Sequence, residues 1–268
     1  MAAPTTPLLS ERRGGVRLLT LNRAPSRNAL DPALVAALTG AVRAVGSEPG
    51  VRAVVLTGAG DAFCAGADLE VLRGLKGASV ARNAADSARL KRLFQALLSC
   101  PRPVVAAVNG PALAGGCGLA TACDLVLADP RATFGYPEVK VGFVAAMVSV
   151  LLSRQLGERA AREMLLTGRI YSADEARALG LVSRLAPAGG VVEEALAEAH
   201  RLASGAPEAL ALTKELLLRT SGLPLGQALD AAAAANVLAR EGAAMQEGLD
   251  AFFARRRPAW VTDEHGPA

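Results

Sequence analysis

Three short and almost uninterrupted apolar runs constrain the fold of this chain more than any other feature. They occupy residues 51–57, 104–108 and 124–128, and a turn-forming Gly, Asn or Asp follows each of them. Runs of this length and character are typical of strands that are buried on both faces, as in parallel sheets covered by helices on both sides. Residues 16–22 have the composition of a further strand.

The segments between these runs have helical patterns. Asp31-Pro32 predicts a helix start, with Asp as the N-cap and Pro in the first turn. Residues 81–99 place Leu90, Leu93, Phe94 and Leu97 on one helical face. From about residue 145 the pattern is mainly helical, interrupted by a short strand at 181–185 and followed by helices at 191–203, 207–220, 225–240 and 242–255. The alternation predicts an α/β core with right-handed crossovers, followed by a helical C-terminal part.

Charge and hydropathy argue against two classes of function. Lys and Arg number 29 against 25 Asp and Glu, and these charges are too scattered to indicate a nucleic-acid interface. The longest apolar run near the middle, residues 141–153, is shorter than the roughly 20 residues that span a bilayer in a helix. The N-terminal residues have no secretory pattern, so we expect a cytoplasmic protein without a membrane partner.

The cysteines predict neither a metal site nor a catalytic thiol. Cys64, Cys100, Cys117 and Cys123 form no Cys-x-x-Cys pair, and the chain has 2 His residues. A zinc site would need a closer set of these ligands, so we expect no metal. Buried, reduced cysteines that pack as small apolar residues are the simplest interpretation.

Two glycine-rich turns follow predicted strands, at residues 58–68 and 114–118. Each places backbone N–H groups between a strand and a helix, where they can hold an anion or a developing oxyanion. For either turn alone, close packing of a helix on a sheet is the more common explanation. A dinucleotide-binding turn needs G-x-G-x-x-G, but Phe63 and Thr121 occupy the place of the third glycine, which argues against a nicotinamide-dependent dehydrogenase.

Taken together, the motifs resemble those of the crotonase, or enoyl-CoA hydratase/isomerase, family. They lie in order between about residues 15 and 257 and comprise Asn22-Arg23, Asn28-Ala29-Leu30, AFCAGADL at 62–69, PVVAAVNG at 103–110, Gly115-Gly116-Cys117, Cys123-Asp124, FGYPE at 134–138, TGR at 167–169 and ARALGLV at 176–182. The resemblance implies a crotonase-like spiral of ββα units in residues 1–204. It also implies a helical region in residues 205–268 that assembles the chain into trimers or hexamers.

The resemblance also implies a site for an acyl-CoA thioester, in which coenzyme A is part of the substrate and no separate cofactor is needed. The backbone N–H groups of Ala67 and Gly115 would form the oxyanion hole. The remaining coenzyme A contacts would come from Ala65, Asp68 and Leu69 along the pantetheine path, with Arg27 as a phosphate contact.

Hydratases of this family use two glutamates, and this chain retains one of the two positions. Glu138 matches the second glutamate, whereas the first falls on Gly118. Taken without the motif, Glu138 would be interpreted as a surface carboxylate paired with Lys140. Within the motif, it is the expected sole acid/base of an enoyl-CoA hydratase that adds water to a 2-enoyl-CoA, or removes it, in lipid metabolism.

Several alternatives remain open. A lone glutamate also suits an enoyl-CoA isomerase, and residues 138–143 (EVKVGF) are similar to members that hydrate or decarboxylate methylglutaconyl-type thioesters. A non-catalytic protein that binds acyl-CoA or RNA belongs to a different class. The presence of both the oxyanion motifs and Glu138 argues against it.

Overall fold

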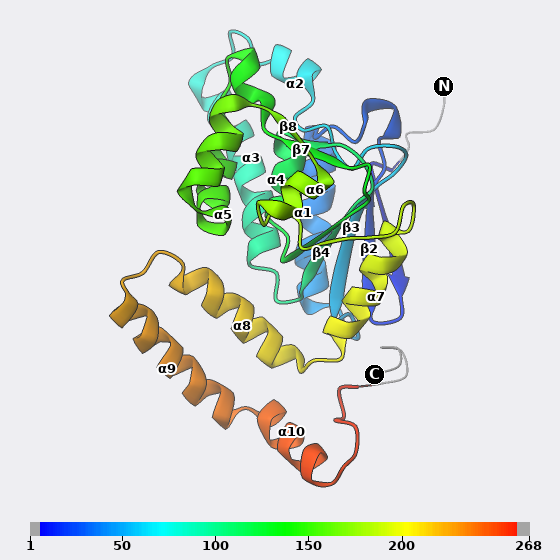
Figure 1. Ribbon diagram of the computed structural model, residues 1–268, viewed down its shortest axis with the longest axis vertical. Helices are drawn as coiled ribbons and strands as arrows, with labels where there is room; N and C mark the ends of the chain where they lie inside the picture. The colour runs from blue at the N-terminus through cyan, green and yellow to red at the C-terminus, as the bar shows by residue number, and fades with distance from the viewer. Residues whose placement is uncertain (1–5, 262–268) are drawn as a thin grey trace.

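The computed structural model describes residues 6–261 and contains two β-sheets flanked by helices (Figure 1). The larger sheet has strand order β1-β2-β3-β4-β6-β9, and the smaller sheet has order β5-β7-β8. In the larger sheet β1 pairs antiparallel with β2, and the other neighbours are parallel. The strands are β1 Leu8–Arg13, β2 Val16–Leu21, β3 Ala53–Gly58, β4 Val104–Val108, β5 Ala112–Leu113, β6 Leu125–Ala128, β7 Thr133–Gly135, β8 Ile170–Ser172 and β9 Arg184–Leu185.

Helices cover both faces of the larger sheet. Two short 3₁₀ helices, η1 and η2, lie in the connections between strands and helices. The helices are η1 Ala24–Ser26, α1 Pro32–Ser47, α2 Leu69–Arg73, α3 Val80–Leu98, α4 Gly115–Thr121, η2 Pro137–Val141, α5 Ala146–Thr167, α6 Ala173–Ala178, α7 Val191–Ala203, α8 Pro207–Thr220, α9 Leu225–Glu241 and α10 Ala243–Phe253. Figure 1 shows α7 on one side of β2, β3 and β4, with α1 and α3 on the other.

Alternate residues of the central strands face two separate apolar cores. On β3, Val54 and Leu56 pack in the core that includes residues of α1 and α3. Ala53 and Val55 point the opposite way, into the core that includes Ala195 of α7. All four of these strand residues are fully buried. This two-sided burial explains why the strands read as continuous apolar runs, and it confirms the predicted α/β class.

Local signals placed several elements correctly. Asp31 is the N-cap of α1, where its carboxylate accepts a hydrogen bond of 2.7 Å from Leu34 N. The predicted helix at 81–99 is α3, Val80–Leu98, and it buries Leu93, Phe94 and Leu97. The helices expected at 191–203 and 207–220 are α7 and α8 with the predicted bounds.

The smaller sheet and its extensions give the chain its spiral course. β5 pairs in parallel with β7, and an isolated parallel bridge joins Cys64 to Ala112 of β5. A second isolated bridge joins Leu30 to Ala67. The smaller sheet and these two bridges together form a second stack of short extended segments. Successive turns of the chain therefore place one strand in the larger sheet and one short segment in this stack. The stack brings the ends of distant segments together beside α4.

Three features were not predicted from the sequence. β1 exposes all of its residues except Leu8, so it carries no apolar pattern, and its pairing with β2 defines it. β7 and β8 are three residues each and pair with one another antiparallel. α5 is interrupted at Gly157, whose φ of 77° and ψ of 164° are not helical.

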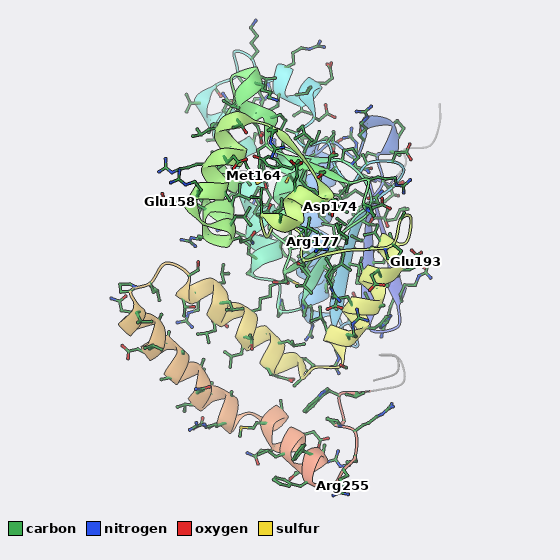
Figure 2. All side chains as sticks on the ribbon, viewed as in Figure 1. Glu158, Met164, Asp174, Arg177, Glu193 and Arg255 are labelled. Carbon is green, nitrogen blue, oxygen red and sulfur yellow. The ribbon has the colours of Figure 1, made fainter. Side chains whose placement is uncertain are left out.

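Helices α8, α9 and α10 form an arm that extends away from the sheets (Figure 1). Among them, α8 and α9 bury no residue and α10 buries Ala251. Figure 2 shows Arg255 at the distal tip of this arm, far from Glu158 and Met164 on α5. No helix within residues 6–261 is both long and apolar enough to cross a membrane.

Candidate active site

The first half of the candidate site consists of the backbone N–H groups of Ala67 and Gly115. Leu30 flanks Ala67 on one side, where Leu30 N donates to Gly66 O at 2.7 Å and Asp68 N donates to Leu30 O at 3.1 Å. In such a parallel bridge the Ala67 N–H points away from Leu30. A Cβ atom added to Gly115 would lie 3.9 Å from Ala67 N, so the two residues are neighbours. Neither N–H donates to an acceptor within residues 6–261, which leaves both available to an external oxygen.

Glycine at two positions permits this close approach. A Cβ atom at Gly66, whose φ is +94°, would lie 2.8 Å from Leu113 O. At Gly116 it would lie 2.1 Å from Cys64 O, which is far inside van der Waals contact. Between them Ala114 adopts φ 50° and ψ −126°, a conformation that costs a non-glycine residue of order 1–3 kcal/mol. The turn thus stores strain where it presents the Gly115 N–H.

The second half of the candidate site is the side chain of Glu138, in the first turn of η2. Burial raises the pKa of this carboxyl group above its ordinary value. Its Oε2 atom is buried and has no hydrogen-bond partner within the described residues. A carboxyl group of this kind is suited to exchange protons close to neutral pH.

Tyr136 ties the segment that carries Glu138 to helix α4. Its ring is fully buried, and its hydroxyl shares a hydrogen bond of 2.6 Å with Thr121 Oγ1. Thr121 Oγ1 also donates to Cys117 O at 2.9 Å, and Gln155 Nε2 donates to Thr121 O at 2.7 Å. Since α4 begins at Gly115, one hydrogen-bond network connects the segment that carries Glu138 to the helix that carries the Gly115 N–H.

Gly118 occupies a closed position on the same helix. A Cβ atom at this residue would lie 2.7 Å from Val148 Cγ2 and 3.0 Å from Phe94 Cζ. A glutamate side chain would therefore need both neighbours to move. Apolar side chains fill the space that a partner carboxylate would occupy. Helix α4 therefore provides no second glutamate to accompany Glu138.

A small cavity of about 60 Å³ is lined by both Ala67 and Gly115. Most of its wall is apolar, and four charged residues also line it: Asp31, Asp68, Asp86 and Arg89. Glu138 is not part of this lining. A larger cavity of about 570 Å³ lies between α8 and the core, where Lys214 pairs with Asp124 at 2.6 Å, and it contains none of the predicted site residues.

The predicted coenzyme A contacts lie on the segments that flank Ala67. Ala65 N donates to Arg27 O at 2.9 Å, which joins the two segments through their backbones. The Arg27 residue is exposed and has a left-handed φ of 51°. Asp68 is the N-cap of α2 and lies 3.3 Å from Arg23, while Leu69 is 72% exposed at the start of that helix.

All four cysteines are buried and free. Burial raises the pKa of the Cys64 and Cys117 thiols to about 12, so neither is a thiolate near neutral pH. Within the part of the chain that the structure describes, no group of three His, Cys, Asp or Glu side chains could hold a metal ion.

The ββα spiral and the paired N–H groups at its inner turns define a protein of the crotonase superfamily. The chain belongs to the enoyl-CoA hydratase/isomerase family, whose model matches residues 11–263.

Relatives with known names support this assignment. A Thermus thermophilus protein, provisionally named an enoyl-CoA hydratase, is 50% identical over 94% of this chain and 99% of its own length. A Beauveria bassiana protein named mevalonyl-coenzyme A hydratase is 38% identical over 91% of both chains.

Solved structures agree with the fold. A crystal structure of an enoyl-CoA hydratase from Mycobacterium smegmatis has a TM-score of 0.87 and 37% identity, covering 96% of this chain and 99% of that one. The structure of Pseudomonas aeruginosa AtuE has a TM-score of 0.90 at 36% identity, covering 96% and 100%.

Proposed function

We propose that this protein hydrates a 2-enoyl-CoA thioester, or dehydrates the 3-hydroxyacyl product, with Glu138 as its sole acid/base. The observation that carries the proposal is the pair of unengaged N–H groups of Ala67 and Gly115. Two unengaged donors on neighbouring residues suit the thioester oxygen, which gains negative charge as the enolate forms. One such preorganised donor contributes about 3–4 kcal/mol to transition-state stabilisation in well-studied enzymes.

The proton transfers in this scheme require one carboxyl group. Glu138 in its ionised form accepts a proton from water while the hydroxyl oxygen adds to the β-carbon of the enoyl group. The double-bond electrons move onto the thioester oxygen, held by Ala67 and Gly115. Glu138 then returns the proton to the α-carbon, so that one water molecule is added and the enzyme is regenerated. The raised pKa of Glu138 favours both directions of transfer near neutral pH.

Isomerisation of a 3-enoyl-CoA to the 2-enoyl-CoA is the second candidate, and the closed position at Gly118 favours it. Val148 and Phe94 fill the place of a second carboxylate, whose role would be to orient water. Moving a double bond needs no water, since one carboxylate can take a proton from the α-carbon and return it to the γ-carbon. The same two N–H groups would stabilise the dienolate.

Turnover of crotonyl-CoA, 3-hexenoyl-CoA and 3-methylglutaconyl-CoA separates these reactions. Crotonyl-CoA loses its enoyl absorbance on hydration, whereas 3-hexenoyl-CoA gains it on isomerisation. Glu138→Gln is the control for either activity. Full activity of this variant on all three thioesters would contradict the role of Glu138, and tight binding without turnover by wild type would favour a binding protein.

For coenzyme A itself, we propose that the backbone of Ala65 and Leu69 lines the pantetheine path beside Asp68. The exposed guanidinium of Arg27 would contact a phosphate. Arg27→Ala should then raise the KM for any acyl-CoA while leaving kcat nearly unchanged, because this contact is equal in the ground and transition states.

We further propose that residues 205–268 assemble the chain into a trimer or a hexamer. The arm of α8–α10 exposes large apolar side chains that a water-exposed surface would not favour. Leu225, Leu229, Leu238, Phe252 and Phe253 are 60–78% exposed. Sedimentation velocity should give a trimer or hexamer for wild type, and Phe252→Glu together with Phe253→Glu should weaken assembly. A monomeric wild type would contradict the proposal.

A further inference from the structure

The cavity that Ala67 and Gly115 line also contains a pair of opposite charges in its wall. Its walls are largely apolar, but Asp86 and Arg89 of α3 also line it. An acyl group whose thioester oxygen lies on the two N–H groups would extend into this cavity. Because the charged pair and the two N–H residues line the same cavity, the pair would contact the part of the acyl group that enters it.

The other charged groups in the cavity wall already have structural partners. Asp31 accepts from Leu34 N as the N-cap of α1, and it lies 3.2 Å from Arg23. Asp68 accepts from Glu70 N as the N-cap of α2, and it also pairs with Arg23. These two carboxylates hold helix ends and have little freedom to recognise a ligand.

Arg89 differs because most of its hydrogen-bonding capacity is unused. Its Nη2 donates to Asp86 Oδ1 at 2.6 Å, within one turn of α3. A guanidinium has five N–H donors in a planar fork, and Arg89 makes no other hydrogen bond to residues 6–261. The side chain is 38% exposed, so it is able to turn toward a ligand without leaving a buried charge unpaired.

We infer that Arg89 selects acyl-CoA substrates whose acyl group carries a carboxylate at its distal end. The inference rests on the proposed function and deepens it by naming the substrate class. A carboxylate bound by the free edge of the guanidinium would make a bidentate, charge-assisted contact. Asp86 holds the opposite edge of Arg89 and orients the fork.

Steady-state kinetics with two thioesters tests this assignment. Crotonyl-CoA and glutaconyl-CoA share the enoyl group and differ in the distal carboxylate. Wild type should have the higher kcat/KM for glutaconyl-CoA. Arg89→Leu should lower that value by about tenfold or more while changing crotonyl-CoA turnover less than twofold, because a hydrogen bond between charged groups is lost for one substrate alone.

Arg82→Leu is the matched control, since it removes an exposed guanidinium from α3 outside the cavity lining. It should change neither substrate. Equal losses on both thioesters with Arg89→Leu, or no wild-type preference for glutaconyl-CoA, would overturn the inference.

Binding of saturated thioesters keeps this test separate from the proposed chemistry. Calorimetry with glutaryl-CoA and butyryl-CoA requires no turnover. Arg89→Leu should weaken glutaryl-CoA binding by about tenfold and leave butyryl-CoA binding unchanged. If wild type turns over neither enoyl thioester but shows this difference in binding, the proposed reaction is wrong and the specificity of Arg89 stands. Equal binding of the two saturated thioesters by wild type would contradict the role of Arg89.

Discussion

The two halves of the candidate site are built in opposite ways. The Ala67 and Gly115 half is made of backbone, and its geometry depends on the crowding of two segments around Gly66 and Gly116. The Glu138 half is one side chain whose pKa is raised by burial. A backbone site tolerates most side-chain changes but fails when its segments are pushed apart. A site made of one side chain loses its function when a single atom of that side chain is replaced, although the protein still folds.

Removal of the carboxylate should have the largest effect of any change to the site. Glu138→Gln keeps the size of the side chain but cannot accept or return a proton. We expect kcat to fall by about 10²–10⁴-fold, the usual contribution of a general acid/base, with KM nearly unchanged. Circular dichroism should show a folded protein. A tenfold or smaller loss of kcat would mean that another group transfers the proton.

A methyl group at the crowded glycine should damage the backbone half through the fold. In Gly116→Ala the Cβ atom meets the Cys64 carbonyl, so the backbone must shift, at a cost of about 3 kcal/mol or more. Urea denaturation should report this loss, and the remaining folded protein should have reduced kcat.

Gly40→Ala provides the control for this change, since within residues 6–261 the added methyl group in α1 would meet no atom closer than 4 Å apart from its own helix backbone and its chain neighbours. It should stabilise the protein by about 0.5–1 kcal/mol, because alanine favours a helix. Equal stabilities of the two variants would show that Gly116 is not crowded.

Filling the closed position on α4 should have an intermediate effect. Gly118→Ala pushes against Val148 and Phe94, which are side chains and can shift, so we expect a loss of about 1–3 kcal/mol. When Val148→Ala is combined with Gly118→Ala, the total loss of stability should be smaller than the sum of the losses of the two single variants. If the double variant loses more free energy of unfolding than the two single variants together, Val148 does not limit the space around Gly118.

Loss of the hydroxyl that ties the two halves together should cost less. Tyr136→Phe removes the bond to Thr121 and should lower the free energy of unfolding by about 1 kcal/mol. It should also lower kcat more than it changes KM, because the segment carrying Glu138 loses an anchor to α4. Tyr171→Phe is the matched control: its ring is equally buried, but its hydroxyl bonds Glu163, which is outside the site. Identical kcat values for the two variants would restrict Tyr136 to a structural role.

The smallest effect concerns stability and pH. The pKa of Glu138 is higher in the folded than in the unfolded protein, so ionisation of this carboxyl group disfavours the folded state. Wild type therefore gains stability as the pH falls from the pKa of Glu138 in the folded protein to its pKa in the unfolded protein. Glu138→Gln has no such dependence. Its Tm should exceed that of wild type slightly near pH 8, and the difference should disappear near pH 4. A variant less stable than wild type at pH 8 would indicate a stabilising partner for the carboxylate.

The sequence alone determined the elements whose signals are local. The apolar runs of β3 and β4 identified strands buried on both faces, and Asp31 identified the start of α1 through its own side chain. The motifs around Ala67, Gly115 and Glu138 also identified the family, because they follow one another along the chain in the family's order and spacing.

The tertiary structure alone decided which distant residues meet. β1, β7 and β8 are defined by pairing with other strands, so their own residues carry little signal. In the sequence, Gly118 shows only that a glutamate is absent. The packing of Phe94 and Val148 shows that this position has no space for a larger side chain unless its neighbours move. In the sequence Arg89 is one of many charged residues, and only the position of α3 shows that it lines the same cavity as Ala67 and Gly115. Contacts between segments far apart in the chain depend on the packing of the sheets and helices, which no local pattern encodes.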